Sequence, residues 1–317
     1  MRCMESENKV VSIVVPVYNR EGTLVRCLDS IAAQEGVERY CLVLVDNNSR
    51  DGSMAVMRRW ASENAALGVS LLTESRQGAS VARNAGLAVV TTPYVMFFDS
   101  DDVMLPGHLK RLLYGIASHR QVDVLCWDIL CELADGRKYR AQCDPSNIVY
   151  NQIIGSVLST QRYAAKTDFI KGIGGWDGEL PGWNDYELGV RIALSRPAVV
   201  KLADPDGTPL VRTYFTDNSI TGAKFSSAPA KWELALDKIE VELMARCPAA
   251  VSLVGYRRAV LAGLYAREGA LSEGRRLLAA APTIGFGRRE AHLVYTFTRL
   301  FGRGTRFIAS PFLPKHL

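Results

Sequence analysis

The chain has 317 residues, of which 48% are hydrophobic and 22% are charged. It is longer than one ordinary domain, and no stretch reaches the roughly 18 uninterrupted apolar residues of a membrane span, so we expect a large globular domain with an appended region and no spanning helix. The formal charge of +5 arises wholly from residues 284–317, where six basic residues face one acid, and a neutral body with a basic tail argues against nucleic-acid binding.

The first hundred residues alternate between short β-branched or apolar runs and segments with helical periodicity. The predicted strands cover residues 10–17, 41–45, 69–73 and 94–98, and the predicted helices cover 23–34, a segment around 56–61 and one that opens at 77–80. This alternation specifies an α/β fold with a mostly parallel sheet flanked by helices. The sequence has no GxGxxG after the first strand and no GxxxxGKS or GxxxxGKT, which disfavours a dinucleotide oxidoreductase and a P-loop phosphotransferase.

Three carboxylates, Asp99, Asp101 and Asp102, directly follow the fourth predicted strand. Ligands of parallel sheets bind beyond the carboxyl ends of the strands, where Tyr18 and Asp46 are also expected. Acids so close together repel one another unless a cation offsets their charge, and hard oxygen ligands suit Mg²⁺ or Mn²⁺. The alternative is a solvated acidic loop that caps the next helix.

The region from 100 to 223 is less regular. The patterns predict a helix over 109–116, strands over 122–130 and 160–165, a hairpin turn at 135–136 before 137–141, a helix from 184, and a hairpin of 199–202 with 210–214. Glycine and tryptophan are concentrated between 172 and 183, which is typical of a lid over a flat polar ligand.

From residue 224 the pattern is purely helical, so we expect an α/β domain over 1–223 and an α-helical extension over 224–317. Apolar stripes predict helices around 232–239, 251–264 and 271–278. Residues 286–317 combine aromatic side chains with arginines, which fits an interfacial helix of about 15 residues on an anionic inner membrane surface. Alternatively, the aromatic side chains pack on the preceding helices and the arginines form a solvated rim.

Seven cysteines are present, an odd number with no CxxC pair. This argues against a disulfide framework or a zinc site and for a reducing compartment. The polar N-terminus, MRCMESENK, contains no apolar signal core. We therefore expect a cytoplasmic protein, placed peripherally on the cytoplasmic membrane face if the tail binds lipid.

Four segments resemble, in order, the motifs of family 2 glycosyltransferases, which have the GT-A fold. They are SIVVPVYNREGTLVRCLDSI (12–31), LVLVDNNSRDGS (42–53), ARNAGLAVVTTPYVMFFDSDD (82–102) and GGWDGELPGWNDYELGVRIAL (174–194). The resemblance covers residues 10 to about 220 and leaves the region beyond 225 uncovered. It implies an inverting, hexosyltransferase-type enzyme that moves a sugar from a nucleoside diphosphate, most often UDP, to a hydroxyl of a glycan or lipid-linked acceptor.

The resemblance also implies a set of donor-binding residues: Pro16, Tyr18, Asn19, Asp46, Arg83, Asp99, Ser100 and Asp101. A bound Mn²⁺ or Mg²⁺ would stabilise the charge that develops on the diphosphate, with Asp101 as the first ligand, Asp99 nearer the ribose and Asp102 in support. Asp46 would accept a hydrogen bond from the uracil N3–H; the alternative for this acid is capping of a helix. Tyr18 either stacks on the base or packs, and Arg83 either reaches the nucleotide or is an exposed helix arginine.

Asp185 matches the second position of the Glu-Asp pair that begins a helix in this family, which implies that it is the general base. The sequence departs from the family pattern in having Asn184 at the first position. Trp176, Trp183 and Asn184 would contact the acceptor, although capping by Asp185 and core packing by both tryptophans are alternatives. Asp217 is a candidate for a further metal ligand, because no histidine lies between 120 and 291.

Two other functions compete with sugar transfer. A sugar nucleotidyltransferase needs a glycine-rich phosphate loop with basic residues after the first strand, and this loop is absent. A catalytically silent subunit that binds nucleotide sugars is suggested only by Asn184. Release of UDP in the presence of an acceptor distinguishes the silent subunit from the enzyme.

Overall fold

The computed structural model describes residues 8–215, 224–302 and 308–314, and the chain divides into two compact units. The first unit comprises Met1–Pro145, Leu158–Pro181 and Arg196–Phe215, and the second comprises Ser146–Val157, Gly182–Ser195 and Thr216–Leu317. Two segments from the region predicted as the α/β domain, 146–157 and 182–195, therefore group with the C-terminal helices. The predicted division between residues 223 and 224 remains a prediction.

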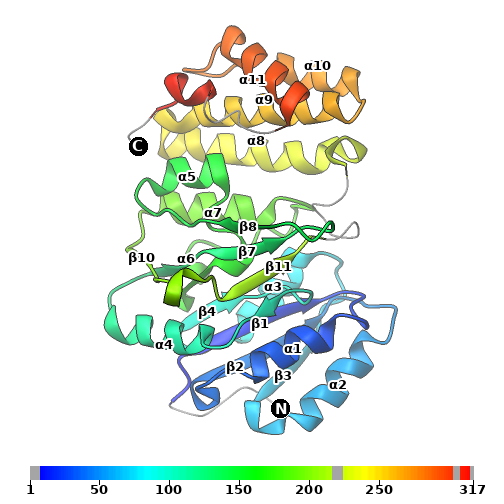
Figure 1. The fold of residues 1–317 in the computed structure, drawn as a ribbon, viewed down its shortest axis with the longest axis vertical. Coiled ribbons are helices and arrows are strands. Elements are labelled where there is room, and N and C mark those ends of the chain that lie inside the picture. The colour runs from blue at the N-terminus through cyan, green and yellow to red at the C-terminus, as the bar shows by residue number, and fades with distance from the viewer. Residues whose placement is uncertain (1–7, 216–223, 303–307, 315–317) are drawn as a thin grey trace. The chain divides into compact units, whose positions relative to one another are not determined.

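The first unit contains a seven-stranded sheet of order β10-β6-β9-β4-β1-β2-β3 (Figure 1). Its strands are β1 (Val11–Val17), β2 (Tyr40–Asp46), β3 (Val69–Thr73), β4 (Tyr94–Phe97), β6 (Val124–Cys126), β9 (Tyr163–Lys166) and β10 (Val199–Lys201). The strands β1, β2, β3 and β4 all run parallel to one another. Strand β9 is antiparallel to both of its neighbours, β4 and β6, and β10 is parallel to β6. The predicted α/β class with a mostly parallel sheet is confirmed.

Strand β1 is buried on both faces, as its β-branched sequence predicts. Val11, Ile13, Val15 and Val17 belong to one core cluster with apolar side chains of α1 (Leu24–Ala32), α2 (Ser53–Glu63) and α4 (His108–Ser118). Helix α3 (Ala79–Val89) packs on the opposite face, where a Cβ on Gly86 would lie 2.4 Å from a methyl group of Val14. Glycine at this position therefore permits the close contact between helix and strand.

A smaller sheet of order β5-β11-β7-β8 also belongs to the first unit. Its strands are β5 (Val103–Met104), β7 (Ile129–Glu132), β8 (Lys138–Ala141) and β11 (Val211–Tyr214), and helix α6 (Thr167–Gly172) follows β9. The predicted hairpin of 199–202 with 210–214 is wrong, because β10 pairs with β6 in the large sheet and β11 pairs with β5 and β7 in the small one. The predicted strand 122–130 is interrupted at residues 127–128, so its two halves belong to different sheets.

Helices form the second unit within its described residues, apart from one isolated β-bridge between Thr283 and Phe286. It comprises α5 (Ile148–Gly155), α7 (Asn184–Leu194), α8 (Pro229–Arg246), α9 (Val251–Arg267), α10 (Leu271–Ala279) and α11 (Arg288–Phe301). Helix α9 is buried on most of its surface, and Gly263 allows α11 to approach it, since a Cβ there would lie 2.5 Å from Cβ of Thr298. The three helices predicted around 232–239, 251–264 and 271–278 are confirmed, and α11 lies within the segment for which an interfacial helix was one alternative. None of the helices described here has the length and apolar character of a membrane span.

Candidate functional site

The carboxyl ends of β1, β2 and β4 lie at one edge of the sheet. Val17 at the end of β1 is in register with Asp46 at the end of β2, and the amide of Phe98, after β4, donates to the carbonyl of Val14 in β1 at 3.0 Å. The side chains that follow these strands therefore project from neighbouring positions. Tyr18, Asp46 and the acidic loop after β4 are gathered there, as the alternation of strands and helices predicts.

Five hydrogen bonds join the loop after β1 to the loop after β2. They connect Asn19 N to Ser49 Oγ, Arg50 N to Asn19 Oδ1, Arg20 N to Ser53 Oγ, Glu21 N to Asp51 Oδ2, and Gly52 N to Glu21 Oε2. Asn19 adopts a positive φ of 50°, which asparagine tolerates better than most residues. Its side chain thus holds the neighbouring loop, whereas the ring of Tyr18 is 41% exposed and available to a ligand.

Asp46 presents one carboxylate oxygen without a partner. Its side chain is buried, and Oδ2 accepts a hydrogen bond from the amide of Ser49 at 3.3 Å. Oδ1 is also buried, yet no donor reaches it in the described part of the chain. A buried acceptor left unpaired costs about 1–3 kcal/mol, so this oxygen is suited to a ligand donor.

Arg83 is buried beside the acidic loop and is not the exposed helix arginine of the alternative interpretation. Its Nη2 lies 2.6 Å from Oδ1 of Asp99, and its guanidinium lies over the ring of Trp176 at 4.3 Å. The Nε and Nη1 atoms are buried without partners among the described residues. Arg83 therefore combines a fixed position with two N–H groups that can donate to a ligand.

Trp176 is held as part of this arrangement. Asn84 donates to its carbonyl at 2.7 Å and accepts from its amide at 2.9 Å, and its ring contacts Phe97 edge-on with centroids 5.0 Å apart. Only 2% of Trp176 is exposed. An acceptor sugar cannot stack on this ring in the described conformation, and the observed position corresponds to the core-packing alternative.

The three carboxylates of the acidic loop have different surroundings. Gln161 donates from Nε2 to Oδ2 of Asp99 and to Oδ2 of Asp102, both at 2.5 Å. The remaining oxygen of Asp102 accepts from the amide of Tyr214 at 3.0 Å. Burial, together with the nearby charges of Asp99 and Asp101, raises the pKa of Asp102 well above its usual range. Asp102 therefore joins the acidic loop to the end of β11.

Asp101 is the carboxylate of the three that accepts the fewest hydrogen bonds from the protein in the described part of the chain. Its Oδ2 lies 3.2 Å from Nη2 of Arg20, and its side chain is 28% exposed. Arg26 donates to its carbonyl oxygen at 2.7 Å and places its guanidinium 4.2 Å from the centre of the Tyr214 ring. Partial burial and the charge of Asp99 raise the pKa of the Asp101 carboxyl, while Arg20 and Arg26 oppose that change.

These surroundings limit how a divalent cation could be held. Within the described residues, no three His, Cys, Asp or Glu side chains are grouped to hold a metal ion. Both oxygens of Asp99 and of Asp102 accept hydrogen bonds from protein donors, which leaves Asp101 as the carboxylate best able to bind a cation. One accessible carboxylate fits Mg²⁺ or Mn²⁺, which commonly take their other ligands from substrate phosphates and water. Ser100 is buried between these acids, and Asp217 lies outside the described residues.

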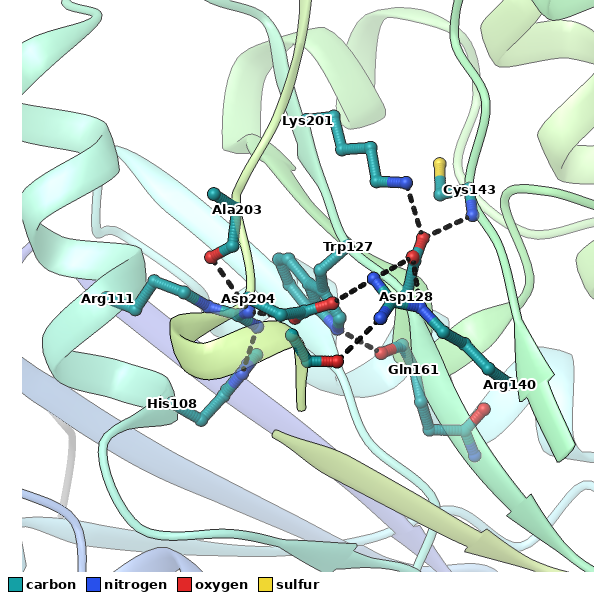
Figure 2. Close-up of polar contacts among 11 residues, drawn as sticks. His108, Arg111, Trp127, Asp128, Arg140, Cys143, Gln161, Lys201, Ala203 and Asp204 are labelled. Atoms are coloured by element: carbon teal, nitrogen blue, oxygen red, sulfur yellow. Dashed lines mark hydrogen bonds and ion pairs between the residues drawn. The ribbon is translucent and has the colours of Figure 1, made fainter. Parts of the chain in front are cut away.

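Gln161 is itself positioned by Trp127, whose Nε1 donates to the Gln161 carbonyl at 2.8 Å. In Figure 2 the side-chain amide of Gln161 points away from a neighbouring cluster of ion pairs. In that cluster Asp128 accepts from Arg140, Lys201 and the amide of Cys143, and Asp204 pairs with Arg111 and Arg140. Asp128 thus lies in the break between β6 and β7, where its buried carboxylate is held by two cations and one backbone amide.

The other predicted residues, Trp183, Asn184 and Asp185, belong to the second unit. Trp183 precedes α7 with a φ of 51° and its ring packs against Tyr186 and Trp232, with centroids 5.6 and 5.5 Å apart. Asp185 accepts a hydrogen bond from the amide of Tyr186 at 2.8 Å and lies in the first turn of α7, where its charge favours the helix dipole. The catalytic role of Asp185 and the acceptor role of Asn184 stay predictions.

The sequence patterns did not identify Arg20, Arg26 or Gln161 as site residues. Arg20 directly follows the Tyr18-Asn19 pair, so its adjacency to that motif was an available signal. Gln161 is 59 residues from Asp102 in the chain, and no local pattern connects the two. Only the pairing of β9 with β4 brings the segment of Gln161 to the acidic loop.

Comparisons with known proteins identify the family and the fold. Residues 12–169 match the family model "Glycosyl transferase family 2", and the chain belongs to this family. It is 33% identical over 110 residues to the uncharacterized glycosyltransferase YibD of Escherichia coli, a match that covers 35% of this chain and 31% of the relative. It is 31% identical over 115 residues to a poly(ribitol-phosphate) beta-glucosyltransferase of Bacillus spizizenii, covering 36% of this chain and 18% of the relative. The chain thus spans less than a third of the length of either relative.

A solved structure gives the fold over most of the chain. TarS 1-349 from S. aureus, in complex with UDP-GlcNAc, matches with a TM-score of 0.67 at 18% identity, over 97% of this chain and 93% of that one. The similarity establishes the GT-A glycosyltransferase fold and, at this level of identity, nothing of the substrate.

Proposed function

We propose that the chain transfers a sugar from a UDP-sugar to a hydroxyl group, with inversion at the anomeric carbon. The observation that carries this proposal is the pair of unsatisfied groups beside the strand ends: Oδ1 of Asp46 and the Nε and Nη1 atoms of Arg83. One is a buried acceptor and the other a buried cationic donor, which are the complements of a nucleobase N–H and a phosphate oxygen. The family 2 match over residues 12–169 supports the reaction class.

Asp46 favours uracil as the base. Its Oδ2 is already occupied by the amide of Ser49, so a single oxygen remains for the ligand. Uracil offers a single N3–H donor, whereas guanine offers adjacent N–H donors that pair best with both oxygens of a carboxylate. Tyr18, Asn19 and Pro16 complete the nucleoside site in this proposal, with the exposed ring of Tyr18 available for stacking on the base.

The diphosphate requires positive charge, because negative charge accumulates on UDP as the glycosidic bond breaks. A divalent cation, Mn²⁺ or Mg²⁺, bound at Asp101 would stabilise this charge. Arg83 donates to the donor nucleotide from a fixed position, and Asp99 orients Arg83 through their 2.6 Å contact. Asp99 also faces the ribose in this proposal, while Asp102 holds the loop rather than a ligand.

Inversion in one displacement needs a general base for the acceptor hydroxyl, and we assign this role to Asp185. Asn184 and Trp183 are proposed to contact the acceptor from the same helix start. The acceptor is a hydroxyl of a glycan or a lipid-linked glycan. The name of the B. spizizenii relative supports a hydroxyl-rich polymer as one candidate.

The donor assignment is tested by calorimetric titration with UDP and GDP, in Mn²⁺ and in chelator. We expect UDP to bind more tightly than GDP, to need the cation, and to lose most of its affinity in Asp101→Ala. Asp46→Asn presents an amide to the base and is expected to weaken UDP binding roughly tenfold, through loss of one charge-assisted hydrogen bond. Equal UDP affinity with and without chelator would remove the metal from the proposal.

We also propose that helix α11 binds the inner face of an anionic membrane. Leu293, Leu300 and Phe301 are 45%, 61% and 61% exposed, and the ring of Phe297 contacts that of Phe301 in a tilted arrangement with centroids 4.6 Å apart. These four positions form a second apolar stripe beside the buried one, and the exposed Arg289 adjoins it. Such a surface combines apolar area with positive charge. This proposal includes the predicted cytoplasmic location; Arg303 and Arg306 lie outside the described residues.

A further inference from the structure

Arg20 approaches the acidic loop from a fixed main chain. Its amide donates to Ser53 Oγ at 2.7 Å, and its carbonyl accepts from the amides of Thr23 and Leu24 at the start of α1. The side chain then extends to Asp101, where Nη2 lies 3.2 Å from Oδ2. Any movement of the guanidinium therefore involves side-chain rotation alone, without rearrangement of the loop.

The ion pair between Arg20 and Asp101 contributes little to folding. The two side chains are 31% and 28% exposed and share a single contact, and partly exposed pairs of this kind contribute about 1 kcal/mol or less. The neighbouring pair differs, because the Arg83 side chain is only 6% exposed and the second oxygen of Asp99 is held by Gln161. Of these two ion pairs at the acidic loop, the one formed by Arg20 is the more easily exchanged.

We infer that Arg20 is a donor-binding residue that changes partners when the nucleotide enters. In the ligand-free chain it neutralises Asp101, and with donor and cation bound it pairs with a diphosphate oxygen while Asp101 binds the cation. This inference rests on the proposed function, since it requires a diphosphate at Asp101. The exchange leaves every charge paired: the carboxylate with the cation and the guanidinium with the phosphate.

The reach of Arg20 is sufficient for this exchange. A phosphate oxygen that shared a cation with Asp101 would lie within about 4 Å of its carboxylate. The guanidinium of Arg20 already contacts that carboxylate. Arginine is suited to the task because its guanidinium stays charged and donates to phosphate oxygens in pairs.

Arg26 does not take part in the exchange. It donates to the carbonyl of Asp101 and rests on the Tyr214 ring, so it stabilises the backbone of the acidic loop whether or not a ligand is present. Arg50 provides a matched control, because it lies in the neighbouring loop and forms no ion pair within the described part of the chain. Arg50→Gln removes the same charge as Arg20→Gln without removing a contact to Asp101.

The test uses Mn²⁺ alone and then UDP. Mn²⁺ binding to the nucleotide-free protein is followed by the loss of the free-ion signal in electron paramagnetic resonance. We expect Arg20→Gln to bind Mn²⁺ about fivefold more tightly than the unmodified chain, because the competing cation is gone. At saturating Mn²⁺ we expect the same variant to bind UDP roughly tenfold more weakly, since a charge-assisted contact to the diphosphate is lost. Arg50→Gln should change both affinities much less.

The outcomes distinguish this inference from the proposed function. If Asp101→Ala binds Mn²⁺ as well as the unmodified chain does, the metal assignment fails and the inference fails with it. If Asp101→Ala loses Mn²⁺ but Arg20→Gln behaves like Arg50→Gln, the partner exchange is overturned and the metal assignment stands. Tighter Mn²⁺ binding with unchanged UDP affinity would overturn the contact between Arg20 and the diphosphate.

Discussion

At the residue scale, the acidic loop after β4 assigns a separate task to each of its three carboxylates. Asp99 fixes Arg83, Asp102 anchors the loop to β11 through the amide of Tyr214, and Asp101 keeps the carboxylate best able to receive a cation. Three neighbouring carboxylates repel one another. Here this repulsion is offset by hydrogen bonds from Arg83, Gln161 and the amide of Tyr214. Sequence position alone does not distinguish the three roles, because the donors lie up to 112 residues away along the chain.

Gln161→Leu tests this division of tasks. The change keeps the side-chain volume but removes the amide that joins Asp99 to Asp102. We expect the free energy of unfolding to fall by about 1–3 kcal/mol, since two carboxylate oxygens lose their donor. UDP affinity should fall roughly tenfold as the loop becomes less ordered. Urea unfolding and calorimetry measure the two effects. The exposed Gln121, changed to Leu, is the control, and unaltered UDP affinity in Gln161→Leu would show that the bridge does not order the donor site.

His108 gives the first unit a pH-dependent stability. Its ring is fully buried against Trp127, 4.6 Å between centroids, and Arg111 donates to Nδ1 at 3.1 Å. Burial, followed by the charge of Arg111, lowers the pKa of His108 well below 6.5. Below pH 6.5 the unfolded chain therefore binds a proton that the folded chain does not, so stability falls as the pH decreases.

Below the ordinary pKa of histidine, His108 is expected to lower the free energy of unfolding by about 1.4 kcal/mol for each unit by which the pH falls. Above that pKa, His108 adds nothing to the pH dependence. Urea unfolding at pH 7.5, 6.5 and 5.5 measures this slope. His108→Gln should unfold with a shallower dependence on pH between pH 6.5 and 5.5, and the same change at the exposed His119 is the control. Identical slopes for His108→Gln and the unmodified chain would contradict the assignment.

At the level of single helices and strands, local periodicity was enough to predict the parallel half of the large sheet. The strands at 10–17, 41–45, 69–73 and 94–98 and the helices between them were predicted within a few residues, because each is a short regular segment with its own apolar pattern. The pairing of β10 and β11 was predicted wrongly, since Asp206-Gly207 is typical of a hairpin turn but the flanking strands find partners in separate sheets. Helix α5 was missed, as its core-facing side includes the polar Asn151 and Gln152.

The exposed stripe of α11 leads to a test with lipid vesicles. We expect the full chain to co-sediment with anionic vesicles at low salt and to be released at high salt, because arginine contacts with lipid are screened. Leu300→Ser combined with Phe301→Ser should weaken co-sedimentation. Tyr114→Ser is the control, because Tyr114 lies in α4 and is 74% exposed. This change should leave co-sedimentation unchanged. Full-length protein that stays in the supernatant with anionic vesicles at low salt would favour the solvated-rim interpretation.

At the scale of the whole molecule, the chain combines an α/β unit that carries the proposed donor residues with a helical unit that carries the proposed base. The gathering of Tyr18, Asp46 and Asp99 at one edge of the sheet was predictable, because these residues lie at or just after strand ends, and Arg83 of α3 contacts Asp99. Their roles in donor binding stay predictions. The discontinuous second unit was not predictable, since 182–195 has the amphipathic pattern of any surface helix. Its grouping depends on packing against helices that lie far away in the sequence.

The central claim, transfer of sugar from a UDP-sugar, is tested most directly by UDP release. The chain is incubated with a panel of UDP-sugars and Mn²⁺, with and without a total glycan and lipid extract as the source of acceptor. We expect release with at least one UDP-sugar, stimulated by the extract and abolished by chelator or by Asp101→Ala. Asp185→Asn should retain UDP binding and lose about 10²–10⁴-fold in rate, as expected for removal of a general base. Cation-dependent UDP binding without release from any UDP-sugar would rule out sugar transfer and identify a catalytically silent binding subunit.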